Sequence, residues 1–188
     1  MSKKQFNYTI EPWLTTNEQV EYTTKIFKVL SREMKIESED HTATFSIVEA
    51  PDWINVIALT ENEEVVLVEQ YRYGIEKPTL ELPGGMVDPG EHPRETSIRE
   101  LKEETGYAGN EVVNLGKVSS NPAILTNYTH TYLVKGCKQV ADQKLDGNER
   151  INVHLMPLQK FLDMVADGEV HHSLVVAAVA KYLLRGKR

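Results

Sequence analysis

The first fifty residues alternate apolar and polar positions in three short runs. The runs are FNYTI (6–10), TKIFKVLSREMKI (24–36) and TATFSIVEA (42–50), and the last two are separated by a polar break at residues 38–40. A period of two is typical of β-strands. Because two or three strands are only marginally stable alone, we expect residues 1–50 to pack on the rest of the chain or on a partner subunit.

A different pattern begins at Pro51, where we place the start of the main domain, residues 51–188. Here strand-like runs alternate with helical ones. The predicted strands are 55–60, 65–72, 79–83, 112–119, 128–135 and 151–156, and the predicted helices are about 93–105, 157–167 and 173–185, the last capped by Ser173. Mixed strands with helices on either side predict an α/β or α+β sandwich.

The first predicted helix carries three glutamates close together. Pro93 suits the first helical position and Gly106 the C-terminal cap. Glu100 and Glu104 are four residues apart on one face, and Glu103 lies beside Glu100. Carboxylates crowded in this way repel one another, and a divalent cation would remove the repulsion; hard oxygen ligands favour Mg²⁺ or Mn²⁺. The alternative is a solvated helix face, the usual role of a charge run.

Length and composition narrow the functional classes. A chain of 188 residues with 40% hydrophobic content can bury a core, as one domain or one domain with an extension. The net charge of −7 argues against a nucleic-acid surface, so an enzyme of anionic substrates would need metal ions. Cys137 is the only cysteine, which excludes an intrachain disulfide and fits a reducing cytoplasm. No apolar run resembles a secretion signal or a membrane span, so we expect a cytoplasmic protein.

The stretch from Gly85 to Tyr107 has a fixed spacing of glycine, glutamate and arginine. Five residues separate Gly85 from Glu91, seven separate Glu91 from Arg99, and RELKEETGY follows without a gap. The stretch resembles the Nudix box, G-x5-E-x7-R-E-U-x-E-E-x-G-U with U apolar, at every fixed position and at both apolar ones. The resemblance covers roughly residues 51–185. It implies a mixed sheet sandwiched between helices and an enzyme in which water attacks a phosphorus atom of a nucleoside diphosphate linked to another moiety.

The resemblance also implies roles for individual residues, and it favours the metal site over the solvated face. The metal ligands would be helix carboxylates and one backbone carbonyl, namely Glu100 and Glu104 with Glu103 and Gly84 assisting. Arg99 would form a buried pair with Glu91, for which the alternative is a surface ion pair. Gly85, like its neighbour, lacks a side chain and lets the backbone approach a ligand closely.

Three features outside the box resemble the ADP-ribose and nucleotide-sugar pyrophosphatase branch of the family. Pro122 lies sixteen residues after Gly106, where that branch has a proline, and the run from Pro51 to Gly74 resembles its strands leading to the box. About fifty residues precede the domain, which implies a dimerising β segment and a homodimer. Many members have alanine where Gly84 stands, and Pro122 lacks the usual Ser-Pro-Gly context, so the sugar stays open.

Candidates for substrate contact come from outside the helix. The guanidinium of Arg72 can grip phosphate oxygens bidentately; the alternative is a strand-end surface arginine. Four aromatic residues are candidates to stack on a nucleobase, and each suits a core or interface position equally: Trp13, Tyr22, Phe27 and Trp53. Of these we favour Trp53. Of the six histidines, none has metal-ligand spacing, and surface or capping roles are expected.

A polar stretch, DQKLDGNER (142–150), precedes the predicted strand at 151. Taken alone it is a solvated loop. In the branch that the chain resembles, a glutamate from this loop swings over the substrate, where it ligates metal or deprotonates the attacking water. Glu149 is the best positional match, ahead of Asp146, with the box residue Glu103 as the next candidate base.

Three functions remain open from the sequence. The leading hypothesis is metal-dependent hydrolysis of ADP-ribose or another nucleoside diphosphate sugar to a nucleoside monophosphate and a sugar phosphate. A second is a Nudix hydrolase of nucleoside triphosphates or dinucleoside polyphosphates. A third is a catalytically silent module that senses a nucleotide sugar. Such modules usually lose box glutamates, whereas this chain has the complete set.

Overall fold

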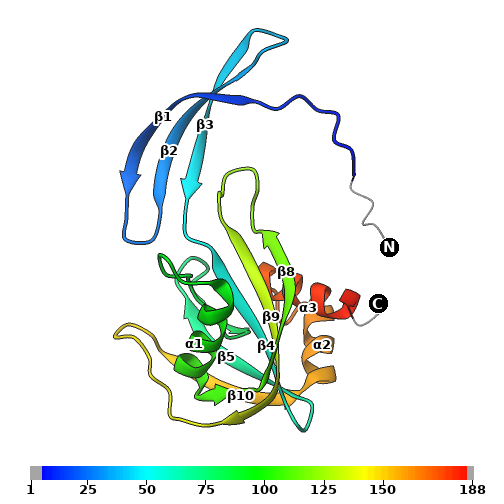
Figure 1. Ribbon diagram of the computed structural model, residues 1–188. Helices are drawn as coiled ribbons and strands as arrows, with labels where there is room; N and C mark the ends of the chain where they lie inside the picture. Colours follow the sequence, from blue (N-terminus) through cyan, green and yellow to red (C-terminus); the bar gives the residue numbers. More distant parts are fainter. Residues whose placement is uncertain (1–5, 186–188) are drawn as a thin grey trace. The chain divides into compact units, whose positions relative to one another are not determined.

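The computed structural model describes residues 6–185, which form two compact units. Of the described residues, one unit comprises 6–50 together with 123–126, and the other comprises 51–122 and 127–185 (Figure 1). In the larger unit the elements run from strand to helix and back, as the hydrophobic pattern predicts. Within residues 6–185, no helix has the length and apolar character that crossing a membrane requires.

The smaller unit contains a three-stranded antiparallel sheet in the order β1–β2–β3. Its strands are β1 (Leu14–Thr23), β2 (Lys28–Ile36) and β3 (His41–Glu49). The predicted strand at 6–10 is wrong, because the structure has no strand there, and β1 was not predicted. Every residue of β1 is exposed, so the strand needs no apolar alternation; charged pairs such as Arg32–Glu18, at 2.6 Å, join it to β2.

The larger unit is built on a mixed sheet in the order β10–β5–β4–β9–β7, with β6 paired to β5 and β8 to β9. Its strands are β4 (Trp53–Thr60), β5 (Glu64–Arg72), β6 (Lys77–Glu81), β7 (Tyr107–Ala108), β8 (Glu111–Ser119), β9 (Tyr128–Gln139) and β10 (Ile151–Pro157). The β4–β9 pair is parallel and the other pairs are antiparallel. The predicted mixed sheet is therefore confirmed, with the two-residue β7 as an unpredicted addition.

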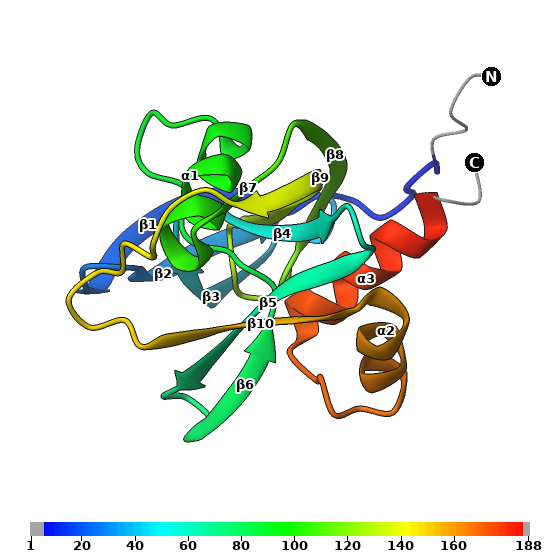
Figure 2. The ribbon, with the colours of Figure 1, turned by 90° about the horizontal axis from the view of Figure 1, so that it is seen from below.

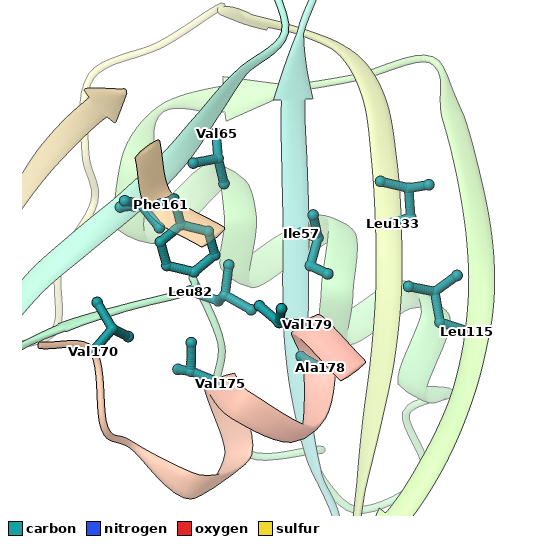
Figure 3. Close-up of a cluster of buried hydrophobic side chains, with 11 residues drawn as sticks. Ile57, Val65, Leu82, Leu115, Leu133, Phe161, Val170, Val175, Ala178 and Val179 are labelled. Atoms are coloured by element: carbon teal, nitrogen blue, oxygen red, sulfur yellow. The ribbon is translucent and has the colours of Figure 1, made fainter. Parts of the chain in front are cut away.

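Helices cover both faces of this sheet (Figures 1 and 2). Helix α1 (Pro93–Thr105) buries Leu101 against one face, together with Val56 and Val66. Helices α2 (Leu158–Ala166) and α3 (Ser173–Arg185) pack on the other, where Phe161 lies among strand side chains that include Val65 (Figure 3). Val65 and Val66 are consecutive in β5 and point to opposite faces, as the strand period requires. The α/β/α sandwich is confirmed.

The ends of α1 agree with the sequence signals. Pro93 is the first helical residue, and Gly106 follows the helix with φ 74°, in the left-handed region that favours glycine. A side chain on Gly106 would also collide with the carbonyl of Ala141. At α3 the cap prediction is wrong by one residue. The Nδ1 atom of His172, not the side chain of Ser173, accepts the Leu174 N–H at 3.2 Å.

Candidate active site

Arg99 joins four acidic side chains within the box. Its Nε and Nη2 donate to the two oxygens of Glu91 at 3.1 and 2.9 Å, and its Nη1 donates to Glu100 at 2.8 Å and Glu103 at 3.0 Å. Asp88 lies farther away, at 3.8 Å. Hydrogen bonds from Arg99 hold the pKa of Glu91 down at about 2. The arrangement fastens the loop after the two glycines to the helix.

Glu104 and Glu100 face the two glycines that precede the helix. Glu104 is buried and accepts the Gly84 N–H at 2.8 Å. A Cβ on Gly85 would lie 2.5 Å from the Glu100 carboxylate, so only glycine fits there without displacing that group. On Gly84, a Cβ would collide with the carbonyl of Ile54. This local packing gives a physical reason for glycine at position 84, where the pyrophosphatase branch that the chain resembles often has alanine.

The hydrogen bonds of the residues next to Gly84 show to which side the Gly84 carbonyl points. The carbonyls of Pro83 and Gly85 accept the N–H groups of Val56 and Ile54 in β4, at 2.8 and 2.9 Å. In an antiparallel pairing, successive residues point their N–H and C=O groups to opposite sides. The Gly84 carbonyl therefore points away from β4, to the side where its N–H meets Glu104.

Burial and mutual repulsion disfavour negative charge at this site. Burial raises the pKa of Glu104 to about 8; the Gly84 hydrogen bond opposes the shift, while Glu100 and Glu149 add to it. Burial likewise raises the pKa of Glu100, against the effect of Arg99, with Glu103 and Glu149 contributing. Glu149 thus lies within electrostatic reach of both box carboxylates. Arg99 does not offset the effects of burial and repulsion on Glu100, whose pKa stays raised, so this group of hard oxygen donors fits a divalent cation.

The carboxylates do not form a finished cage. Among the side chains of residues 6–185, no three or more His, Cys, Asp or Glu groups have the spacing to hold a metal ion by themselves. Glu103 is directed to Arg99 rather than to Gly84. Any ion at Glu100 and Glu104 would therefore need further oxygen ligands, from the backbone, water or a phosphate, as is usual for Mg²⁺.

The loop that carries Glu149 is tied at its base to the last turn of α1. The side-chain amide of Gln143 donates to the carbonyl of Glu104 at 2.6 Å and to that of the first residue of β10 at 3.2 Å. The Lys144 N–H donates to the carbonyl of Glu103 at 2.8 Å. These hydrogen bonds attach the loop base to the end of the helix.

The tip of this loop is closed on itself. The Glu149 carboxylate accepts the Asp146 N–H at 2.9 Å, and the Glu149 N–H donates to the Asp146 carbonyl at the same distance. Arg150 also donates to the carbonyls of Gly147 and Glu149. The side chain of Glu149 is therefore held by its own loop.

Arg72 ends β5 and is not a free surface arginine. Its Nε and Nη2 donate to the two carboxylate oxygens of Glu81, both at 2.6 Å. Its hydrogen bonds to Glu81 raise the pKa of Arg72, and the charge of Glu104 adds to the effect. Because Glu81 lies three residues before Gly84, the pair holds Arg72 near the glycines that precede the helix. Glu81 was missed in the sequence. Its burial and the pairing of its strand with the one that carries Arg72 are seen only in the structure.

The two remaining predicted contact residues are placed differently. Trp53 begins β4, is half-buried, and its backbone bridges to Met86, directly after Gly85. Pro122 is exposed in the connection between β8 and β9 and takes no part in the contacts above.

A groove of about 550 Å³ runs beside the loop base, lined by Tyr107, Gln143 and others, and its lining includes none of the box carboxylates.

Comparison with known proteins identifies the class. Residues 51–178 match the family model described as NUDIX domain. A methanol dehydrogenase activator of Bacillus methanolicus is 32% identical over 167 residues, which are 85% of this chain and 90% of that protein. The chain belongs to the Nudix family.

One further relative and one solved structure are also similar to this chain. An ADP-ribose pyrophosphatase of Bacillus subtilis (strain 168) is 28% identical over 134 residues, 71% of this chain and 72% of that protein. The crystal structure of an ADP compounds hydrolase superposes with a TM-score of 0.82 at 20% identity, covering 96% of this chain and 98% of that one. That structure has the same fold.

Proposed function

We propose that this protein hydrolyses the pyrophosphate bond of ADP-ribose or another nucleoside diphosphate sugar, giving a nucleoside monophosphate and a sugar phosphate. The observation that carries the proposal is that the buried Glu104 and the half-buried Glu100 lie against Gly84 and Gly85. The family membership and the relatives named above support the same substrate class. A Nudix hydrolase of triphosphates or dinucleoside polyphosphates would use the same carboxylates, so the substrate needs a direct test.

Glu100 and Glu104 would hold Mg²⁺ or Mn²⁺, with the Gly84 carbonyl and Glu103 assisting. A bound ion there supplies Lewis-acid neutralisation of the pyrophosphate and lowers the pKa of a bound water. Arg99 holds Glu91 and the helix together, so that these carboxylates keep their places. Glu149 takes a proton from the attacking water once its loop closes.

Substrate contacts are proposed for four residues. Arg72 donates to phosphate oxygens, and Gly85 admits the pyrophosphate close to the backbone. Trp53 stacks on the base from the start of β4, and Pro122 shapes the connection beyond β8. The single cysteine, Cys137, is buried and unpaired among the described residues, which fits the proposed cytoplasmic location.

The deciding experiment is incubation of the protein with Mg²⁺ and ADP-ribose, with product analysis for AMP and ribose 5-phosphate. A panel of other nucleoside diphosphate sugars, nucleoside triphosphates and dinucleoside polyphosphates is run in parallel, with a chelator-treated control. We expect the highest kcat/KM for a nucleoside diphosphate sugar and no turnover with chelator. Preference for triphosphates or polyphosphates would favour the second hypothesis, and no turnover at all would favour the silent sensor.

We also propose a homodimer formed through the N-terminal unit. Its sheet exposes apolar side chains, including Val20, Tyr22 and Phe45, and three strands are marginal without a partner. Light scattering of the wild-type protein at micromolar concentration should give twice the mass of one chain. A fully active monomer at that concentration would refute the proposal. Tyr22→Asp, which places a charge on this sheet, should shift the protein towards the monomer.

A further inference from the structure

Glu81 is a buried carboxylate outside the Nudix box. It ends β6 and is only 3% exposed. Besides the two bonds from Arg72, its Oε1 accepts the Thr79 hydroxyl at 2.5 Å, and the His172 ring lies 3.8 Å from its Oε2. Burial alone would raise the pKa of Glu81, but the hydrogen bonds from Arg72 and Thr79 outweigh it and the pKa lies below its usual value.

The two side chains of the Arg72–Glu81 ion pair differ in their exposure to solvent. Glu81 is almost fully covered, whereas the side chain of Arg72 is 43% exposed. A buried ion pair contributes little to stability compared with apolar residues of similar size. An interior carboxylate, three residues before Gly84, that fixes a half-exposed guanidinium therefore suggests a role for that guanidinium outside the pair.

The geometry leaves Arg72 able to bind a second anion. A guanidinium has five N–H donors arranged as a fork on each edge. Glu81 takes the edge formed by Nε and Nη2. The edge formed by Nη1 and the second Nη2 hydrogen remains able to grip two oxygens of one phosphate.

We infer that Glu81 is a positioning residue, which orients the guanidinium of Arg72 for the diphosphate of the substrate. The inference rests on the proposed function and extends it to a residue that does not touch substrate. Thr79 fixes the carboxylate, the carboxylate fixes one edge of the guanidinium, and the other edge faces the ligand. Without Glu81, Arg72 would sample several rotamers and would pay ordering entropy on binding.

The test is a double-mutant cycle of Glu81→Gln and Arg72→Ala, read out as KM and kcat for ADP-ribose and as the Kd of ADP by calorimetry. Arg72 binds ground state and transition state alike, so KM and Kd should rise about tenfold or more in each single variant, with kcat changing less. In the Arg72→Ala background, Glu81→Gln should change either constant less than about twofold. Equal effects in both backgrounds, or none in the wild-type background, would overturn the inference.

Controls separate positioning from general damage. Glu69→Gln is matched, because Glu69 lies in β5 and pairs with His154 at 2.7 Å; it should leave KM, kcat and Kd unchanged. Thermal unfolding is followed for every variant. If Glu81→Gln does not fold, Arg72→Lys is used in its place, because lysine keeps the positive charge but has no second edge of donors. Arg72→Lys should then weaken the binding of ADP as much as Arg72→Ala does. A wild type that binds ADP in an Arg72- and Glu81-dependent way but hydrolyses nothing would refute the proposed function and keep this inference.

Discussion

Glu104→Gln is expected to lower kcat by about 10³-fold. Metal-ion catalysis contributes several kcal/mol to lowering the barrier, and each 1.36 kcal/mol corresponds to about a factor of ten in rate. The amide oxygen of glutamine can still accept the Gly84 N–H, so the contact that places residue 104 is kept. What the substitution removes is the charge that would hold the cation. Activity is measured with ADP-ribose and Mg²⁺, alongside thermal unfolding.

The fold should tolerate this change. Burial raises the pKa of Glu104, so its ionised form already costs stability near neutral pH, and a neutral isostere should not lower the unfolding temperature. Glu95→Gln is the matched control, because Glu95 lies exposed in the first turn of the same helix; it should leave kcat unchanged. If Glu104→Gln retains full activity, the metal ligands lie elsewhere.

The sequence predicted α1 well because its signals are local. Pro93 and Gly106 act within one turn of the helix ends, and the structure places both as expected. The cap of α3 was wrong for a similarly local reason, since the preceding histidine offers an acceptor nitrogen as suitable as a serine hydroxyl. Strand β1 was missed because a strand exposed along its whole length shows no alternation.

Other features depend on contacts between distant residues, which one sequence does not reveal. Glu81 meets Arg72 across a hairpin, and the meeting depends on the register that pairs Arg72 with Lys77. Gln143 reaches the carbonyl of Glu104 from a loop thirty-nine residues later. Within the box, by contrast, Arg99 and Glu103 are one helical turn apart, so their hydrogen bond follows from helix geometry alone.

Glu149→Gln is expected to reduce kcat by about 10²- to 10⁴-fold, the usual contribution of a general base, with a much smaller change in KM. A glutamine at 149 can still accept the Asp146 N–H that closes the loop tip, and the loop base stays tied to α1 through Gln143. The loop should therefore keep its conformation and lose only the group that removes the proton from water. Steady-state kinetics with ADP-ribose measures both constants.

Asp146→Asn is the matched comparison in the same loop. In the contacts that close the tip, Asp146 supplies its backbone N–H and carbonyl, which the substitution leaves in place. Its effect on kcat should therefore be small, although it removes one negative charge three residues from Glu149. If the two substitutions lower kcat equally, the loop contributes charge or mobility rather than a base. If Glu149→Gln raises only KM, the base lies elsewhere, and Glu103, which Arg99 holds at 3.0 Å beside Glu100, is the next residue to replace.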